Sequence, residues 1–297
     1  MIVASRREKA AYYLYLIPAF VCFGVFIFWP TIQSFYLSLC KYSLSTINKD
    51  PDFVGIKYYR DLFVGTSKTK FMITLKNTAV YTFFTVPVAM TLGLFLAMMV
   101  HSKLIKRKNF YKVALYIPYV SSMVAVASVF KLLFSEASFG IVNQLLAKLG
   151  MEKPVPFLSD GKWAMFTVIL LSIWKSLGYI MIIYLGGLCG ISDDIYEAAD
   201  LDAVTPWKKL TKITFPLLKA TTFFLVATET ISSFQVFTPV NVLTGGGPGY
   251  STTTLISYLY EEGFKSGRMG KGSAIAVIIF AILSVLTVIQ KKLTDED

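Results

Sequence analysis

Long apolar runs dominate this sequence and limit what it can fold into. Each run holds about 20 residues or more, the length that an α-helix needs to cross the hydrocarbon core of a bilayer. Because lipid offers no hydrogen bonds to the backbone, such runs must satisfy their own polar groups, and a helix does this within one segment. We predict an all-α integral membrane protein with six transmembrane helices, at about 11–39, 73–100, 113–134, 163–189, 217–243 and 272–290.

Composition supports the membrane class and excludes several others. The 297 residues are 55% hydrophobic, and the net charge is +11. A basic surplus also occurs in nucleic-acid-binding proteins, but here the lysines flank the apolar runs, which is typical of membrane proteins. We therefore expect a lipid bilayer as the partner and no nucleic acid.

No chemistry-bearing cluster is visible in the sequence. The three cysteines, Cys22, Cys40 and Cys189, are far apart and fit neither a disulfide framework nor a metal site. The sequence has no nucleophile constellation and no Gly-x-x-x-x-Gly-Lys-[Ser/Thr] phosphate loop. We predict that the chain is not an enzyme and holds no catalytic residue, metal or cofactor of its own.

Basic residues are densest in the segment 101–112, which carries five lysines or arginines and no acid. The positive-inside rule places this segment in the cytoplasm. With six spans, both termini and the segment 191–218 then lie on the same side. The run 11–39 is too long for a signal-peptide core and lacks a clear cleavage site, so we expect an uncleaved span in a bacterial plasma membrane.

The polar segment 191–218 interrupts two apolar runs and carries five acids. Ser192 suits the N-cap of a first short helix, because two aspartates then fall in the first turn, where the helix dipole favours negative charge. Thr205 suits the N-cap of a second, with Pro206 at its first position. We predict two short helices here; a solvated hairpin that only joins two spans is the alternative.

The residue pattern of this segment resembles a known loop. Glu197-Ala198-Ala199, Asp202-Ala203 and a later Pro216 resemble the EAA loop of ABC importer permeases, whose pattern is E-A-A-x-x-D-G-A followed by I-x-L-P. In that family the loop forms a cytoplasmic coupling helix that docks on an ATPase subunit. Ala203 departs from the usual Gly, and a left-handed backbone there would cost about 1 kcal/mol.

Other motifs extend the resemblance over about residues 12–291, to the carbohydrate-uptake subfamily of the maltose F-type, glycerol-phosphate and raffinose permeases. They are the segments 53–63, 76–78, 117–119, 174–179, 233–235 and 243–248. The resemblance implies a type I ABC importer permease fold, a second homologous permease, two ATPase subunits that bind ATP and Mg, and an extracytoplasmic solute-binding protein. It also implies a carbohydrate substrate.

Site residues follow from the same resemblance. The coupling positions are Glu197, Ala198, Ala199, Asp202 and Ala203. The positions that face substrate fall on or near Tyr119, Met123, Trp174, Gly178, Met181, Glu229, Ser233 and Val236, although plain helix packing is the alternative for the apolar ones and close helix contact for Gly178. The turn at Gly245, Gly246, Gly247 and Pro248 is expected either to shape the binding-protein docking surface or only to end a span.

Charged residues inside the spans add an argument that is independent of the family. A charge within a bilayer needs a partner or water, so it marks a cavity or a contact. Lys131 lies near the end of its span and can reach the interface. Lys175 and Glu229 lie near mid-membrane depth, and we expect them to share the translocation cavity, paired with each other or each facing substrate hydroxyls. A purely structural ion pair is the alternative.

These observations predict the permease subunit of an ATP-driven, binding-protein-dependent importer for a sugar or oligosaccharide. The alternatives are a permease for a non-sugar solute such as a glycerol-phosphate compound, a channel, or an intramembrane enzyme. The expected organisation is a tail, first span and loop over 1–72, a permease core over 73–291 that contains the coupling loop 191–218, and a C-terminal tail over 292–297.

Overall fold

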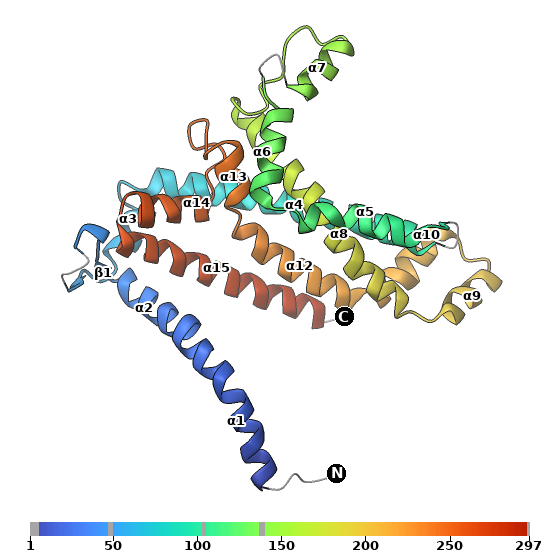
Figure 1. The fold of residues 1–297 in the computed structure, drawn as a ribbon, viewed down its shortest axis with the longest axis horizontal. Helices are drawn as coiled ribbons and strands as arrows, with labels where there is room; N and C mark the ends of the chain where they lie inside the picture. The colour runs from blue at the N-terminus through green and yellow to red at the C-terminus, as the bar shows by residue number, and fades with distance from the viewer. Residues whose placement is uncertain (1–5, 47–49, 103–104, 137–139, 296–297) are drawn as a thin grey trace. The chain divides into compact units, whose positions relative to one another are not determined.

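The computed structural model describes residues 6–46, 50–102, 105–136 and 140–295 (Figure 1). Helices make up nearly all of its regular structure, so the all-α prediction is confirmed. Within the described residues the strands β1 (Cys40–Lys41) and β2 (Asp52–Phe53) are two residues long and pair antiparallel.

The chain forms two compact units. The first comprises Met1–Lys68 with Leu259–Phe280, and the second comprises Thr69–Tyr258 with Ala281–Asp297. Helix α15 (Met269–Asp295), which contains the predicted sixth span, passes from the first unit into the second.

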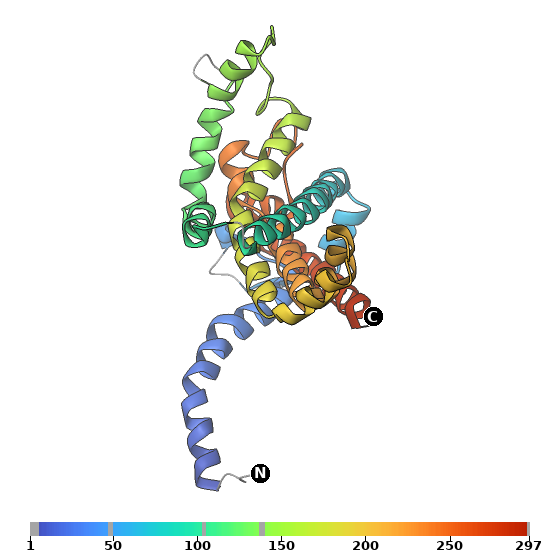
Figure 2. The same cartoon turned by 90° about the vertical axis from the view of Figure 1, so that its right-hand side faces the viewer.

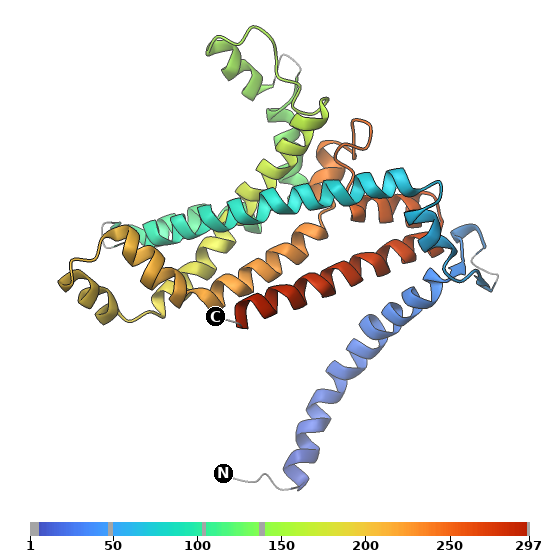
Figure 3. The same cartoon turned by 180° about the vertical axis from the view of Figure 1, so that it is seen from behind.

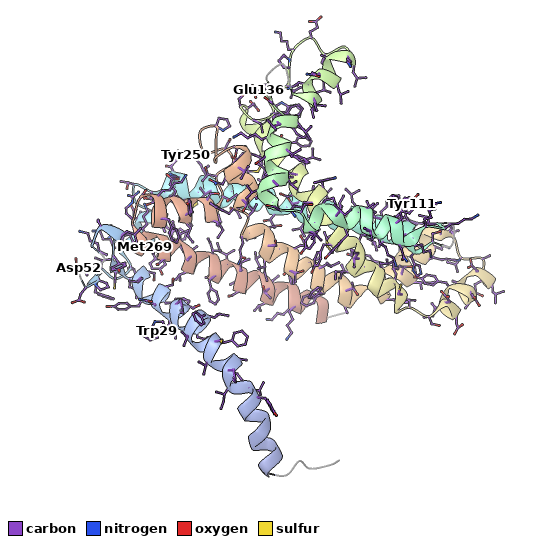
Figure 4. All side chains as sticks on the ribbon, viewed as in Figure 1. Trp29, Asp52, Tyr111, Glu136, Tyr250 and Met269 are labelled. Carbon is purple, nitrogen blue, oxygen red and sulfur yellow. The ribbon has the colours of Figure 1, made fainter. Side chains whose placement is uncertain are left out.

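The first unit begins with a long apolar helix. It consists of α1 (Arg6–Phe23), a π-helical turn (Gly24–Phe28) and α2 (Trp29–Ser38), and its candidate span Tyr15–Ser38 has none of its most apolar window buried within the chain. Trp29 is 66% exposed, and its side chain projects from α2 (Figure 4). A helix that is apolar all round and uncovered is suited to contact lipid or another protein.

The remainder of the first unit packs around the end of this span. It contains β1, a 3-10 turn (Leu44–Thr46), β2, α3 (Lys57–Phe63), a π-helical turn (Glu261–Lys265) and the start of α15. The Tyr59 hydroxyl donates to Ser38 Oγ at 2.8 Å. Gly270 lies so close to the Cys40 carbonyl that a Cβ there would overlap it. The start of α15 is therefore held directly against β1.

The second unit is a bundle built on α4 (Lys68–His101), α8 (Gly161–Cys189) and α12 (Lys219–Phe234) (Figure 3). Their facing sides bury Ala89, Ala97, Ile180, Tyr184 and Leu225, among others. A Cβ on Gly93 would overlap Ile180, so a small residue is what allows α4 to approach α8 closely. The spans predicted at 73–100 and 163–189 are present, and the first of them begins five residues earlier than expected.

The third predicted span is broken. The apolar run 113–134 forms α5 (Lys108–Val120) and α6 (Met123–Leu133), whose axes differ by 92° (Figures 1 and 2). Ser121 and Ser122 lie between them in an extended conformation, with ψ of 148° and 127°. The predicted span is therefore divided between two helices and is not one continuous helix. Pro118 lies inside α5 and removes one backbone donor there, but α5 continues past it to Val120.

The fifth predicted span is interrupted as well. Helix α12 ends at Phe234, and α13 (Thr238–Leu243) begins after a three-residue gap with Pro239 in its first turn. Proline is common at the start of a helix, because the backbone N–H that it lacks would have no hydrogen-bond acceptor within the helix at that position. The chain beyond α13 turns at the predicted glycines and enters α14 (Leu255–Tyr260).

The count of spans agrees with the prediction when the bent pair is taken as one. In the described residues five helical segments are long and apolar enough to cross a membrane, and α5 with α6 makes up to six. Between α6 and α8 a short helix, α7 (Ile141–Lys148), forms part of the connection.

The segment 191–218 folds as the sequence predicts. Helix α9 (Asp193–Leu201) starts after Ser192, whose Oγ accepts from the Asp194 N–H, and α10 (Pro206–Lys209) starts after Thr205, whose Oγ1 accepts from the Lys208 N–H. A π-helical turn (Leu210–Thr214) and α11 (Phe215–Leu217) then lead into α12. Ala203 has φ of +49°, the left-handed conformation for which the family's usual Gly is suited.

Candidate functional site

A polar cavity of about 300 Å³ lies within the second unit. Its wall is formed by α4, the α5–α6 break, α8, and the α12–α13 break. Polar side chains are unusual inside apolar helices, because they must find partners away from water. The residues that line the cavity are Tyr81, Thr85, Tyr119, Met123, Ser172, Lys175, Ser176, Glu229, Ser232, Ser233, Gln235, Val236, Phe237, Thr238 and Pro239.

Six of the predicted substrate-facing residues line this cavity together, although they come from four helices and a loop. They are Tyr119, Met123, Lys175, Glu229, Ser233 and Val236. Glu229 and Ser233 follow the i, i+4 spacing that places residues on one helical face, and both line the cavity. Val236 was predicted on the same helical face, but α12 ends at Phe234, so Val236 lines the cavity from the loop that follows.

Three other predicted residues lie elsewhere. Met181 is fully buried in the core between α4 and α8, and the Trp174 ring packs against Phe130 at 5.4 Å between centroids. Gly178 contacts the backbone of α5, where a Cβ would overlap the Leu115 carbonyl. These are the packing arrangements that the sequence left open as alternatives.

Lys175 reaches the break between α5 and α6. Its Nζ donates to the carbonyl oxygens of Pro118 at 3.1 Å, Tyr119 at 2.6 Å and Ser121 at 2.9 Å. An ammonium group has three N–H donors, so these bonds use all of them. Lys175 and Glu229 thus share the cavity without forming an ion pair.

Glu229 is half-buried and faces the cavity from α12. Within the described residues it makes no hydrogen bond or ion pair of its own, and its neighbours along the wall include the hydroxyls of Ser232 and Ser233. A carboxyl group in that position has acceptor sites open toward the cavity.

An aromatic part of the cavity wall is Tyr119, whose ring stacks on Tyr179 behind it. The rings of Tyr119 and Tyr179 are 4.8 Å apart between centroids, with 14° between their planes. A flat, partly exposed aromatic face with polar groups around it suits a ligand that has both C–H faces and hydroxyls.

Sequence reasoning missed the polar residues of α4 and α8. Tyr81 with Thr85, and Ser172 with Ser176, are each spaced i, i+4 inside apolar runs, and all four line the cavity. That spacing puts each pair on one helical face and was a readable signal.

A second cavity, of about 560 Å³, lies beside the predicted coupling loop. Glu197 on α9 lines it together with His101, Lys108 and Asp200, among others, and the Tyr196 hydroxyl lies 3.1 Å from Thr214 Oγ1. Ala199 is buried, whereas Ala198, Asp202 and Ala203 are exposed. The outer side of the loop also exposes apolar side chains, chiefly Leu201 and Trp207.

The turn at Gly245-Gly246-Gly247-Pro248 is held by side-chain hydrogen bonds. Thr253 Oγ1 donates to the Gly246 carbonyl at 2.9 Å, and Thr252 Oγ1 donates to the Gly247 carbonyl at 2.9 Å. From α4, the Asn77 amide donates to the carbonyls of Tyr250 at 2.8 Å and Thr253 at 3.0 Å. Gly245 and Gly246 have positive φ, so the glycines permit this compact loop, from which Tyr250 projects (Figure 4).

An ion network in the first unit was not predicted. Lys271 Nζ lies 3.4 Å from Asp61 and 3.5 Å from Glu262, and Arg268 lies 2.8 Å from Glu262. Partial burial opposes ionisation of Asp61, but hydrogen bonds from Ser67 and Thr66 and the charge of Lys271 outweigh it and hold its pKa below the usual range. Glu262, Arg268 and Lys271 lie within ten residues of one another, but Asp61 is about 200 residues earlier, so no local pattern reveals the whole network.

No metal centre accompanies these features: among the residues that the structure describes, no group of three or more His, Cys, Asp or Glu side chains is arranged to hold an ion. Apolar helices around a polar cavity, two of them broken at its wall, define a membrane transport component.

Comparison with known proteins gives the family. Residues 89–295 match the model of the binding-protein-dependent transport system inner membrane component family, and this chain belongs to that family. The predicted relationship to importer permeases is therefore confirmed, and the chain is a transport component and not an enzyme.

Individual relatives cover nearly the whole chain. It is 33% identical to the arabinooligosaccharides transport system permease protein AraP of Bacillus subtilis (strain 168), over 97% of this chain and 89% of that protein. It is 30% identical to the sn-glycerol-3-phosphate transport system permease protein UgpA of Agrobacterium fabrum, over 97% of this chain and 96% of that protein. A chain of a bacterial alginate ABC transporter, solved in complex with an alginate pentasaccharide-bound periplasmic protein, has the same fold, with a TM-score of 0.82, 23% identity, and coverage of 97% and 95%.

Proposed function

We propose that this chain forms half of the translocation pathway of an ATP-driven importer for a sugar or oligosaccharide. The observation that carries the proposal is the cavity wall, where Glu229 and serine hydroxyls stand beside the Tyr119–Tyr179 stack. Aromatic faces pack on sugar rings, and carboxylate and hydroxyl groups take sugar hydroxyls. The relative AraP is named as a permease of an arabinooligosaccharide transport system, which supports the same substrate class.

The cavity has the size for part of such a substrate. Its volume of about 300 Å³ is at the lower end of the range of small-molecule pockets, roughly 300–1,000 Å³. A second homologous permease would supply the opposite wall, so that a longer glycan is held between the two subunits.

The charges in the cavity favour a neutral glycan over a glycerol-phosphate compound. A phosphate needs cationic or N–H donors, and arginine or lysine usually supplies them. Lys175 is the cation in this cavity lining, and backbone carbonyls take all three of its donors. Glu229 adds acceptor oxygens, which suit hydroxyl donors and would repel an anion.

Two ATPase subunits are proposed to drive the movement. They bind ATP and Mg, and one of them docks on the coupling loop 191–218 through Glu197, Ala198, Ala199, Asp202 and Ala203. The exposed apolar side chains Leu201 and Trp207 support a protein contact there, because large exposed apolar groups mark interaction surfaces. Closure of the ATPases would move the loop and tilt the spans that follow it.

The proposed orientation puts the loop 191–218 and both termini in the cytoplasm of a bacterial cell. The basic segment 101–112 supports this sidedness. The turn Gly245–Pro248 then faces outward and contributes to the docking surface for a solute-binding protein. We retain the organisation into 1–72, a core over 73–291 and a tail over 292–297 as a proposal.

A transport assay tests the proposed function. The chain, its second permease, the ATPases and the solute-binding protein would be reconstituted in proteoliposomes, and a panel of labelled neutral glycans and glycerol phosphates would be offered with and without ATP. We expect ATP-dependent uptake of a glycan. Uptake of glycerol phosphates alone, or uptake that does not need ATP, would contradict the proposal.

A further inference from the structure

The break between α5 and α6 leaves backbone carbonyls without helical partners. Helix α5 ends at Val120, and the extended conformation of Ser121 and Ser122 prevents the next N–H groups from reaching back. Ile117 is the last residue of α5 whose carbonyl receives a backbone N–H, from Ser121 at 3.1 Å. Carbonyls at a helix end need other partners, and inside a membrane water is scarce.

One side chain supplies those partners. The Lys175 ammonium, carried by α8, donates to the carbonyls of Pro118, Tyr119 and Ser121. These carbonyls also mark the C-terminal, negative end of the α5 dipole, where a cation is favoured. Two of these bonds go to the last turn of α5 and the third goes to Ser121 just beyond it, so one group holds the chain at the point where it bends.

This arrangement has the form of a cation site. In secondary transporters the unwound carbonyls and C-terminal ends of broken helices coordinate a cation such as Na⁺. Here the same kind of carbonyl cluster contains an ammonium group that is covalently part of the chain. The cation is therefore always present and needs no ion gradient.

We propose that the Lys175 ammonium is a tethered cation that fills the carbonyl site of the broken α5–α6 span, fixes its bend and so positions Tyr119 in the cavity, without binding substrate itself. The substrate role of the cavity rests on the function proposed above. The structural role of Lys175 does not.

Tyr119 is the link from the bend to the cavity. Its carbonyl accepts the shortest of the three Lys175 bonds, at 2.6 Å, and Lys175 Nζ lies 5.6 Å from the centre of its ring. The ring stacks on Tyr179 and lines the cavity. Straightening the span would move Tyr119 off the cavity wall, so Lys175 is a positioning residue.

A distance measurement tests the bend directly. Spin labels at Val113→Cys and Val129→Cys, both on exposed positions, would be read in the reconstituted transporter with Cys22 and Cys189 replaced by serine. With 8 residues on each side of Ser121 at about 1.5 Å each, the 92° bend separates the two Cα atoms by roughly 17 Å, and a straight helix by about 24 Å. We expect Lys175→Met to move the distance distribution toward the longer value.

The matched controls distinguish the cation from the side chain's bulk. Lys175→Arg retains a cation with several donors and is expected to keep the short distance. Lys131→Met makes the same chemical change on exposed α6 and is expected to alter neither distance nor uptake. If Lys175→Met does not reach the membrane, Lys175→Gln gives the comparison, because its amide donates hydrogen bonds without a charge.

Chemical rescue tests the tethered-cation role. Lys175→Ala removes the equivalent of n-propylammonium, and we expect uptake to fall at least about tenfold, as for the loss of one buried hydrogen-bonded charge. Added n-propylammonium should restore uptake in part. Tetramethylammonium, which has no N–H, and n-propanol, which has no charge, should not.

The outcomes separate this inference from the proposed function. An unchanged distance in Lys175→Met and Lys175→Gln would overturn the inference, whether or not uptake falls. Loss of uptake with an unchanged distance and altered glycan preference would instead assign Lys175 to the substrate. Absence of glycan uptake by the unaltered chain would contradict the proposed function and leave the distance test intact.

Discussion

Gly178 brings α8 into direct contact with the backbone of α5 at Leu115. A Cβ at Gly178 would overlap the Leu115 carbonyl, so only glycine allows this approach. Lys175 lies one helical turn earlier on α8 and binds the end of the same α5. The two contacts together hold the first half of the broken span against α8, one by close packing and the other by hydrogen bonds.

Gly178→Val should therefore destabilise the bundle. Forcing a branched side chain into a packed contact costs about 1–3 kcal/mol, and we expect lower membrane abundance and a lower midpoint of thermal unfolding. Gly186→Val is the matched control on the same helix, because a Cβ at Gly186 meets no atom within 4 Å. Equal effects of the two substitutions would show that the close contact is not what matters.

The local features of the segment 191–218 were predictable because their causes are local. Ser192 and Thr205 cap the helices that directly follow them, and Pro206 starts the second. The left-handed conformation at Ala203 was likewise indicated by the family's glycine at this position. Each depends on residues within one helical turn, which a sequence shows directly.

Ala203→Gly should stabilise the loop. Ala203 has φ of +49°, and this left-handed conformation costs a residue with a Cβ about 1 kcal/mol. The gain from glycine is smaller than this, because glycine loses more backbone entropy on folding. We expect a slightly higher unfolding midpoint with normal uptake. Ala199→Gly is the control: it lies buried within α9, where the same substitution should destabilise by about 1 kcal/mol.

Glu197→Lys should uncouple the transporter. Glu197 is exposed on α9 and lines the second cavity, and reversing its charge would disturb an ATPase that docks on the segment 191–218 as proposed. We expect uptake and transport-coupled ATP hydrolysis to fall at least about tenfold while membrane abundance stays normal. Glu152→Lys, the same change in the α7–α8 connection, should have no such effect.

The sidedness on which that prediction depends has its own measurement. Ser192→Cys in sealed cells, with Cys22 and Cys189 replaced by serine, should resist an impermeant thiol reagent and react after permeabilisation. Labelling from outside would contradict the cytoplasmic placement of the loop.

Gly246→Val should weaken docking of the solute-binding protein. Gly246 has φ of +93°, and a Cβ there would lie 2.7 Å from Thr253 Oγ1, so the substitution distorts the braced turn. Gly247→Ala is the control, because the nearest atom to its Cβ is 3.5 Å away and its φ is not positive. Normal docking and uptake in Gly246→Val would leave the turn with only the role of ending a span.

The parts of the site that sequence did not predict are those fixed by distant contacts. In the run 113–134, the carbonyls that the break leaves without helical partners accept hydrogen bonds from Lys175, which lies 54 residues after Ser121. Similarly, the resemblance placed Trp174, Gly178 and Met181 among the positions that face substrate, but in the structure they contact Phe130, α5 and the core. Polarity was the better guide, since Glu229 and Ser233 both face the cavity.

Glu229→Gln should weaken substrate binding without unfolding the protein. Glu229 faces the cavity with no ion-pair partner among the described residues, so the amide removes a charge that the fold does not use. Hydrogen bonds to a charged acceptor contribute about 1.5–3 kcal/mol, against roughly 1 kcal/mol for a neutral one. We expect the KM for uptake to rise about tenfold, with nearly normal maximal rate and membrane abundance.

The competing interpretation, a structural Lys175–Glu229 pair, gives a different pattern. It predicts that Glu229→Gln lowers abundance, and that the double variant with Lys175→Met restores abundance with unaltered substrate preference. The geometry opposes this pattern, because all three N–H donors of Lys175 bind the carbonyls of Pro118, Tyr119 and Ser121 and none binds Glu229. The effects of the two substitutions should therefore add in the double variant. Uptake kinetics and abundance measured for both single variants and the double variant decide between them, since additive losses support separate roles and mutual rescue supports the pair.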